Sequence, residues 1–487
     1  MLTLGSFHAY ISDAIGVLSD SGKTSGLAAY GKVSDTLYSE LRRLVTKDVV
    51  GWRFNRKRFA PSPHNMSKLK VDAYQRSKVL NSVPSDTNVF RLTRRFLPHT
   101  VAATGERVMQ DLVLEIVHQV KEETNSDRLA LSGGLFQNVA LNRRIAEADL
   151  FKQIHVPMAP SDAGLSLGQL LFEVHKQREH APKTTRKMPA YLGPSFSEKE
   201  IESLLGEMRL IHERSESIVD WAVERLLAGK VVGWFQGRGE YGPRALGNRS
   251  ILADPRITSI KARVNQLLKK RDWFMPYAPA VLEEFGSEWA KHFFVSPYMQ
   301  FVFEFPEDRH VQVSSAVHVD GTSRIQSVNE KDNPLFYALI RRFYEHTGIP
   351  MVLNTSFNRH GIATIGSPRQ ALDHFLEGCV DCLAIGPFGL DIEENRLLTP
   401  PSLKVELSEK ILLAQHCLNH LRQLVEQGSI HLPWSDLVTQ LNSEFGLNLS
   451  LDQKNLYLKT KDDDYPLSDA GLQRLMNDLP SIVESVV

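Results

Sequence analysis

One stretch rich in glycine and arginine constrains this chain more than any other. It reads Gly233-Trp-Phe-Gln-Gly-Arg-Gly-Glu-Tyr-Gly-Pro-Arg-Ala-Leu-Gly-Asn-Arg-Ser-Ile-Leu-Ala-Asp-Pro-Arg256. Short apolar runs at 230–235 and 250–253 predict a strand on either side of a loop. Glycines let a backbone approach a ligand closely, and neighbouring guanidinium groups bind phosphate or carboxylate. The stretch therefore predicts an anion-binding loop, because an ordinary arginine-rich surface loop has no need of this spacing.

Composition excludes several classes of protein. At 487 residues the chain can form two or three domains, and 42% hydrophobic with 23% charged residues is usual for a globular protein. Lys plus Arg equals Asp plus Glu at 57 each, so the chain as a whole has no net charge to attract nucleic acid or a membrane. We find no apolar run of about 18 residues and no secretory leader, which predicts a cytoplasmic protein.

Cysteine usage agrees with a reducing compartment. Three cysteines, Cys379, Cys382 and Cys417, are too few for a disulfide framework. The first two have the spacing of a redox or zinc motif, but there is no second pair. A single pair of this kind more often consists of two small buried residues than of a zinc or redox site.

Residues 40–80 form a basic arm with few acids. Trp52, Phe54 and Phe59 lie among its cations. Such an arm can hold RNA or an anionic acceptor, since phosphates favour clustered cations and bases stack on aromatic rings. A solvated insertion that faces an acidic partner is the more frequent structure, and both interpretations stay open.

The next segments predict a packing helix and a ligand-binding turn. Apolar residues recur at helical spacing over 101–121. Residues 129–142 then read as a short buried strand that runs into a Gly-Gly turn and opens a helix, an arrangement that presents free N–H groups to a phosphate or ribose. The alternative is a plain strand-to-helix turn with capping amides. A second such turn, at 155–169, places Asp162 to cap a helix or to bind a metal.

Downstream, a polar linker precedes two helices and then further cationic motifs. The helices begin at Ser197 and near Ile218, before the glycine- and arginine-rich loop. Beyond that loop, Lys269 and Arg271 lie in the segment 260–279, Arg324 follows His318-Val-Asp-Gly-Thr-Ser, and an Asn-Thr-Ser-Phe-Asn element spans 354–358. Residues 402–487 predict helices at 407–427 and 433–445 with a small polar module, either a docking module or a structural cap.

Several of these motifs together resemble one known family. Gly-Arg-x-Glu-Tyr-Gly-Pro-Arg-Ala-Leu-Gly-Asn-Arg-Ser is similar to the signature of the O-carbamoyltransferases, the antibiotic and nodulation-factor carbamoylases, and the motifs at 132–142, 265–279 and 353–361 resemble it too. The resemblance covers about residues 1–395. It implies an α/β protein with an incomplete ASKHA-type (actin-like ATPase) domain at 1–178, a linker at 179–195, a YrdC-like domain at 196–398 and a mostly helical extension at 402–487.

The resemblance also implies a reaction. The second domain would form carbamoyl adenylate from carbamoyl phosphate and ATP. The first would pass the carbamoyl group across a divalent metal, iron or Mg, to a hydroxyl of a small natural product or sugar. Residues matched to the family are Arg238, Arg244, Arg249, Lys269, Arg271 and Arg324 as a catalytic clamp, Glu240, Asn354, Ser356 and Asn358 for substrate, Ser132, Gly133, Gly134 and Asn138 for nucleotide, and Asp162 for metal.

The chain also departs from the family pattern. The family's His-x-x-x-His helix is not found, Met275 stands where an arginine is usual, and Ile362 stands where an acid is usual. Three hypotheses follow: a carbamoyltransferase, alone or with a partner protein that supplies the histidines; a nucleotide-binding, non-catalytic paralogue; and a tRNA-directed carbamoyl-type transferase. The expected partners are carbamoyl phosphate and a small hydroxylated acceptor, with neither nucleic acid nor membrane.

Overall fold

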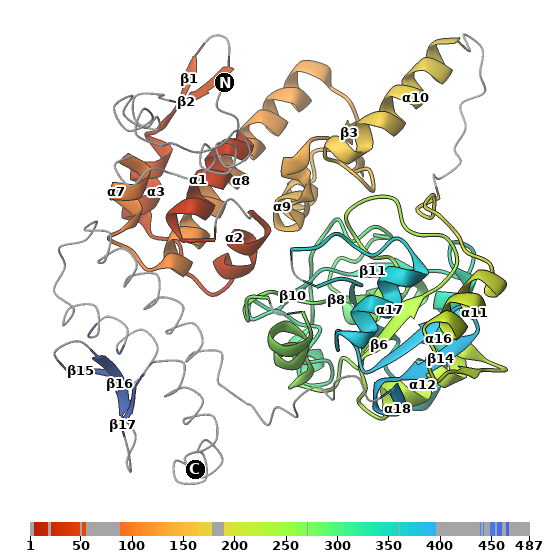
Figure 1. The fold of residues 1–487 in the computed structure, drawn as a ribbon. Coiled ribbons are helices and arrows are strands. Elements are labelled where there is room, and N and C mark those ends of the chain that lie inside the picture. The colour runs from red at the N-terminus through yellow and green to blue at the C-terminus, as the bar shows by residue number, and fades with distance from the viewer. Residues whose placement is uncertain are drawn as a thin grey trace, which may run out of the picture. The chain divides into compact units, whose positions relative to one another are not determined.

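The computed structural model describes residues 4–17, 21–48, 51–54, 88–177, 189–269, 271–359 and 361–395, with short pieces from 439 to 466. Its contacts divide the chain into two compact units (Figure 1). The first unit holds residues 1–111 and 402–487, and the second unit holds residues 112–401. None of the helices in the described ranges is long and apolar enough to span a membrane.

The first unit is mainly helical where it is described. It contains α1 (Leu4–Ala14), α2 (Ser21–Ala28), α3 (Asp35–Arg42), α7 (Asn88–Thr93), the start of α8 (Pro98–Thr124) and the hairpin of β1 (Val45–Asp48) and β2 (Gly51–Phe54). The helix predicted at 101–121 is confirmed by α8. Inside the unit, His8 Nε2 lies 2.7 Å from Glu106 Oε2, and both side chains are buried. Most of the basic arm, residues 55–80, lies outside the described residues.

The carboxyl-terminal residues contain an element that the sequence analysis missed. Strands β15 (Leu449–Asp452), β16 (Asn455–Lys459) and β17 (Asp464–Pro466) form an antiparallel sheet. The helices predicted at 407–427 and 433–445 lie outside the described residues, apart from Thr439 and Asn442, which are helical. A mostly helical extension is therefore an incomplete description, because the extension also contains a sheet.

A mixed eight-stranded sheet forms the core of the second unit. Its order is β11-β8-β12-β7-β6-β13-β14-β5, with β11–β8 and β6–β13 parallel and the other neighbours antiparallel. The strands are β5 (Glu213–Arg214), β6 (Val232–Phe235), β7 (Arg249–Ala253), β8 (Ala278–Leu282), β11 (Gln326–Val328), β12 (Met351–Ser356), β13 (Cys382–Ile385) and β14 (Phe388–Asp391). Both strands predicted beside the glycine- and arginine-rich loop are confirmed, as β6 and β7. A separate pair, β9 (Phe303–Glu304) and β10 (Thr322–Ser323), lies outside this sheet.

Helices pack on the sheet and begin at the residues expected to cap them. α16 (Pro334–Thr347) packs on β8, β12 and α12 (Ile218–Leu227), and α17 (Pro368–Leu376) packs on β6 and β13. The helix predicted to begin at Ser197 is confirmed as α11 (Glu198–Glu207), and Ser197 and Glu200 form a capping box at its start. The short elements are α13 (Ile260–Ala262), the π-helical turn η3 (Arg263–Leu268), η4 (Glu283–Phe285), α14 (Gly286–Trp289), α15 (Glu307–His310) and α18 (Ile392–Asn395).

The rest of the second unit is a smaller α/β segment. The end of α8 leads into β3 (Arg128–Ala130), η1 (Gly134–Gln137), α9 (Val139–Glu147), β4 (Gln153–His155), η2 (Asp162–Gly164) and α10 (Leu165–Gln177). The predicted strand-turn-helix is confirmed, but the expected burial of the strand is wrong. Arg128 and Ala130 are exposed, because among the described strands β3 pairs with β4 alone, in parallel.

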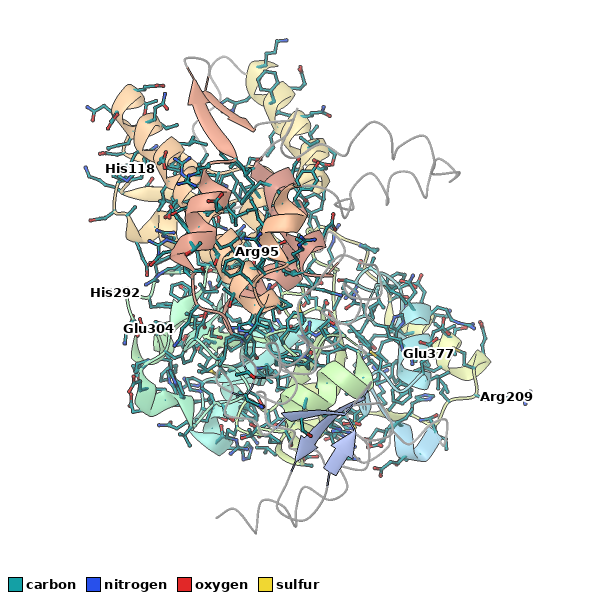
Figure 2. The ribbon with its side chains drawn as sticks, turned by 90° about the vertical axis from the view of Figure 1, so that its left-hand side faces the viewer. Arg95, His118, Arg209, His292, Glu304 and Glu377 are labelled. Carbon is teal, nitrogen blue, oxygen red and sulfur yellow. The ribbon has the colours of Figure 1, made fainter. Side chains whose placement is uncertain are left out.

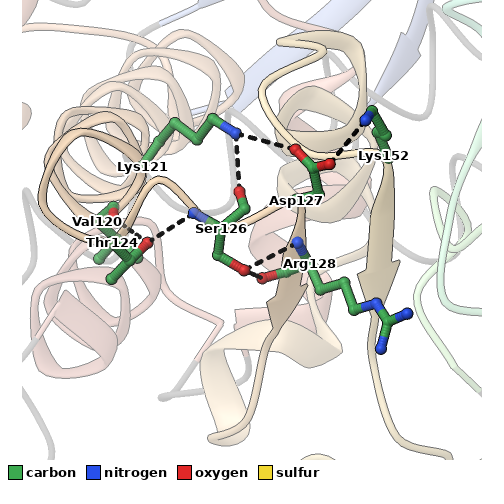
Figure 3. A network of polar contacts seen from close by, with 7 residues as sticks. All are labelled: Val120, Lys121, Thr124, Ser126, Asp127, Arg128 and Lys152. Carbon is green, nitrogen blue, oxygen red and sulfur yellow. Dashed lines mark hydrogen bonds and ion pairs between the residues drawn. The ribbon is translucent and has the colours of Figure 1, made fainter.

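Polar contacts tie the end of α8 to this small sheet (Figure 3). Lys121 Nζ donates to the Ser126 carbonyl at 2.8 Å and lies 3.5 Å from Asp127. Asp127 also accepts from Lys152 at 2.7 Å, just before β4. These groups are largely exposed, so the contacts fix local geometry and each contributes little to stability.

Candidate anion-binding site

Four of the predicted cations lie close together in the second unit. Arg244 comes from the loop between β6 and β7, Lys269 and Arg271 from the end of η3, and Arg324 from between β10 and β11. Burial lowers the pKa of Lys269, and the positive charges of Arg271 and Arg324 lower it further. Burial likewise lowers the pKa of Arg324, with Arg244 and Arg271 adding to the shift. We name these four residues the cation cluster.

No carboxylate of the described residues forms an ion pair with any member of the cation cluster. Arg324 has no polar partner among them at all. By contrast, ionisable side chains on the outside of the unit, such as Arg209, His292, Glu304 and Glu377, are exposed to solvent (Figure 2). Grouping like charges in a partly buried site is costly, so this arrangement favours an anionic ligand.

Neutral oxygens surround the ammonium of Lys269, which is 3% exposed. Its Nζ donates to the Ser356 carbonyl at 2.7 Å, to Asn358 Oδ1 at 3.0 Å and to Ser356 Oγ at 3.2 Å. Ser356 Oγ in turn lies 2.6 Å from Asn358 Oδ1. The structure thus brings Lys269 together with two of the predicted substrate-binding residues at the end of β12.

Asn265 holds Arg271 in place. Its Oδ1 accepts from Arg271 Nε and from the hydroxyl of Tyr277, while its Nδ2 donates to the Trp273 and Met275 carbonyls at 3.2 and 3.0 Å. The Arg271 guanidinium also stacks 4.4 Å from the centre of the Tyr277 ring. Met275 therefore contributes its carbonyl to this support, although its side chain cannot supply the charge of the arginine usual there.

Arg249 and Arg238 bind the backbone instead. Arg249 is 1% exposed, stacks 3.7 Å from the centre of the Phe235 ring, and donates to the carbonyls of Gln236, Gly237, Asn248 and Pro194. Burial lowers its pKa to about 10. Arg238 donates to the Gly193 and Leu192 carbonyls at 2.9 and 3.0 Å. Both guanidinium groups hold the loop to residues 192–194.

Amide side chains fix the loop that carries Arg244. Asn354 Nδ2 donates to Gln326 Oε1 at 2.8 Å and to the Ala245 carbonyl at 3.3 Å. Gln326 Nε2 donates to the Leu246 carbonyl at 2.8 Å. Gln326, Asn265 and Tyr191 were not among the predicted site residues. Gln326 lies between the apolar residues Ile325 and Val328 in a short strand, and this was the available signal, since a buried amide needs partners.

The Gly-Gly turn borders the same loop. Arg244 donates to the Gln137 carbonyl at 3.4 Å, and Tyr241 donates its hydroxyl to the Ala163 carbonyl at 2.5 Å. Gly242, at φ +113°, leaves 2.7 Å between the position of a Cβ and the Met158 carbonyl oxygen, so a side chain would clash there. The two predicted sites therefore adjoin within the second unit.

In the turn itself, Ser132, Gly133 and Gly134 are exposed, and Gly133 adopts φ +114°. A Cβ on Gly133 would meet no atom within 4 Å, so the space above the turn is open. Asn138 Oδ1 accepts from the Leu141 N–H at 3.0 Å and caps α9. The capping interpretation of Asn138 is thus correct, and the turn remains accessible to a ligand.

Asp162 does not belong to a metal site within the described residues. Its side chain is exposed and bonds to no described residue. No group of three or more His, Cys, Asp and Glu side chains in the described ranges could hold a metal ion. The donor set present does not fit the divalent metal that the resemblance implies.

Two further features lie outside the cation cluster. A cavity of about 250 Å³, lined among others by Phe196, Phe235 and Pro387, includes no member of the cluster, so we do not assign it to the anion site. Cys379 and Cys382 are both buried, as the sequence analysis expects. Burial raises the pKa of Cys379 to about 11.

The second unit thus holds a cluster of four cations, Lys269 buried and three arginines half-buried, beside an exposed glycine turn in an α/β fold. Comparison with known families agrees. Residues 3–171 match the family model described as carbamoyltransferase N-terminus, and residues 223–391 match carbamoyltransferase C-terminus. The chain belongs to the carbamoyltransferase family.

Individual relatives give the same result. The chain is 36% identical to nodulation protein NolO of Bradyrhizobium diazoefficiens over 315 residues, which cover 61% of this chain and 56% of that protein. It is 34% identical to nodulation protein NolNO of Sinorhizobium fredii, covering 63% and 46%. An uncharacterised protein of Methanocaldococcus jannaschii is 31% identical, covering 79% and 61%. The chain thus spans about half to three fifths of the length of these relatives.

Proposed function

We propose that this protein is an O-carbamoyltransferase that activates its carbamoyl donor with ATP. Carbamoyl phosphate, water and ATP would give carbamoyl adenylate, orthophosphate and pyrophosphate. Attack by an acceptor hydroxyl on the carbamoyl carbon would then give the carbamate ester and AMP. We further propose a small natural product or sugar as the acceptor, and the cytoplasm as the site of action.

The single observation that supports this proposal is the cation cluster, with which no carboxylate of the described residues forms an ion pair. Carbamoyl phosphate and the phosphates of ATP are anions, and negative charge shifts among their oxygens during attack at the α-phosphorus. Preorganised cations in a site shielded from water stabilise that charge more strongly than the same groups would in water. Arg244, Lys269, Arg271 and Arg324 would hold the phosphoryl groups, while Ser356 and Asn358 orient the small carbamoyl group.

The fold supports a division of labour within the chain. We propose that the eight-stranded sheet with its helices is a YrdC-like adenylating domain, and that residues before the linker belong to an ASKHA-type domain. The exposed turn at Ser132, Gly133 and Gly134 would bind the nucleotide in that domain. We derive no step through a metal, because Asp162 has no further ligands among the described residues.

Turnover of ATP to AMP and pyrophosphate tests the adenylating step. We expect carbamoyl phosphate to stimulate pyrophosphate release by the wild type, and Arg244→Ala to reduce it by about 10- to 100-fold, the loss typical of one charged hydrogen bond. Arg342→Ala is the matched control, since Arg342 lies on the surface of α16, paired with Asp220 at 2.7 Å. It should leave turnover unchanged.

Two other results would contradict the proposal. ATP binding without pyrophosphate release would favour a non-catalytic or partner-dependent paralogue, for which Met275 and Ile362 argue. RNA binding that weakens steeply with salt would favour a tRNA-directed transferase. Equal loss of turnover in Arg342→Ala and Arg244→Ala would show that the assay does not report on the cation cluster.

A further inference from the structure

Glu240 is the one carboxylate in the loop of residues 237–249, and it lies among arginines. An ion pair with one of them would be the simplest use of its charge. The structure shows a different use. Glu240 Oε1 accepts from three backbone N–H groups, those of Leu246 at 2.8 Å, Asn248 at 2.8 Å and Arg249 at 3.1 Å.

Three N–H groups that converge on one oxygen form a backbone nest for an anion. Here the anion belongs to the chain itself and precedes the nest by six to nine residues. The loop is therefore closed on itself, and Arg244 lies between Glu240 and the first of the three N–H groups. No ion pair joins this carboxylate to Arg244, so the carboxylate does not neutralise the Arg244 side chain.

The opposite side of the same backbone is held as well. The Leu246 carbonyl accepts from the Tyr191 hydroxyl at 2.9 Å and from Gln326 at 2.8 Å. Asn333 Nδ2 donates to Tyr191 and to Asn248 Oδ1, both at 3.0 Å. Both the N–H and the carbonyl of Leu246, two residues after Arg244, are thus fixed.

We propose that Glu240 is a positioning residue, which sets the Arg244 guanidinium in the cation cluster by organising the loop backbone while leaving its charge free for a phosphoryl group. This inference rests on the proposed function and deepens it. Lys269 provides an internal comparison. Its Nζ donates to residues at and just after the end of β12, on a different segment of the chain. A change at Glu240 should therefore not displace Lys269 through the loop.

A double-mutant cycle on binding of carbamoyl phosphate and of orthophosphate tests the proposal. In the wild-type background we expect Glu240→Ala to weaken binding about 10- to 100-fold, because a misplaced Arg244 loses its charged hydrogen bond. In the Arg244→Ala background the same change should have little further effect, since coupled residues are non-additive. In the Lys269→Met background it should again cause the full loss.

The conservative change Glu240→Gln separates position from charge. Its carbonyl oxygen can still accept from the three N–H groups, so we expect it to recover most of the binding. Tyr191→Phe removes one hydrogen bond from the same loop without cutting into the nest, and should weaken binding by a smaller factor, again only when Arg244 is present. If Glu240→Ala fails to fold, Tyr191→Phe replaces it in the double-mutant cycle with Arg244→Ala.

Each contrary outcome has one meaning. If Glu240→Ala causes the full loss in the Arg244→Ala background, as it should in the Lys269→Met background, the positioning role alone is overturned. A Glu240→Gln protein as impaired as Glu240→Ala would overturn it too. A wild type that binds neither carbamoyl phosphate nor orthophosphate would overturn the proposed function, and the positioning role with it. The two failures are therefore distinguishable.

Discussion

Two of the parallel strand pairs in the second unit, β6 with β13 and β3 with β4, have very different surroundings. β6 and β13 lie inside the eight-stranded sheet, and every residue of both strands is buried. β3 and β4 form a two-stranded sheet of their own, and the outer residues of each strand are exposed. Both β3 and β6 lead into glycine-containing turns. Burial of a strand thus depends on its neighbours as well as on its own sequence.

The helices beside the two pairs differ in the same way. α16 buries Phe336, Leu339, Ile340 and Phe343. α10 follows the small sheet, and its Leu170 and Phe172 are 61% and 66% exposed. A helix gains most of its stability from packing its apolar face, so equal apolar content does not give equal stability in the two places.

The largest test of this difference uses one substitution in both helices. We expect Phe343→Ala to lower the free energy of unfolding of the second unit by about 3–5 kcal/mol, because it leaves a cavity in the core. Phe172→Ala should change it by less than about 0.5 kcal/mol, as for an exposed site. Urea denaturation followed by circular dichroism measures both. Equal losses would show that α10 is as well covered in solution as α16.

Removing a charge from the cation cluster should change anion binding and protein stability in opposite directions. Arg324→Met should weaken orthophosphate binding by about 10- to 100-fold, because it removes a charged hydrogen bond to the ligand. The ligand-free protein should be as stable as the wild type or more so, since the change removes one like charge from a cluster that no described carboxylate pairs with.

Calorimetry and thermal unfolding of the same samples provide the two measurements. Arg342→Met removes a surface arginine that is paired, and should leave binding intact. A ligand-free Arg324→Met protein that is strongly destabilised would contradict the account of the cluster.

These contrasts also show what the sequence could and could not predict. Strands β6 and β7, the helix starts at Ser197 and near Ile218, and the turn after β3 follow from local patterns, and all are present. Other contacts join residues far apart in the sequence. Arg249 bonds to Pro194, 55 positions away, and Arg238 bonds to Gly193, 45 positions away. No spacing rule reports whether such an arginine meets a ligand or a carbonyl. The exposure of β3 depends likewise on how many strands pair with it.

The buried Lys269 should make the free energy of unfolding of the second unit depend on pH. Burial and the neighbouring cations lower its pKa in the folded protein. Between that pKa and the unfolded value of about 10.4 the unfolded chain binds more protons, so this group makes stability rise with pH. The difference in unfolding free energy between the wild type and Lys269→Met should therefore grow in favour of the wild type across that window. Saturating orthophosphate should reduce the slope, because an anion raises the pKa of the lysine.

Subtracting the Lys269→Met protein removes the contribution of groups that do not interact with Lys269, such as Cys382, whose pKa is raised by burial. A difference that stays constant from pH 7 to 10.5 would show that Lys269 is not perturbed by its surroundings.

The smallest expected effect concerns local structure, which should be the same in both parts. Asn138 caps α9 beside the small sheet with a bond of 3.0 Å, and Ser217 caps α12 beside the large sheet with a bond of 3.2 Å. Replacing either residue by alanine should lower the free energy of unfolding by about 1 kcal/mol, because a cap satisfies one N–H wherever the helix lies.

Asn138→Asp keeps an acceptor and serves as the matched control. If Asn138→Ala weakens ATP binding while Asn138→Asp and Ser217→Ala do not, then the cap also orders the turn at Gly133. Equal ATP binding in all three proteins would limit Asn138 to its local role, and the two parts of the unit would differ only in what covers them.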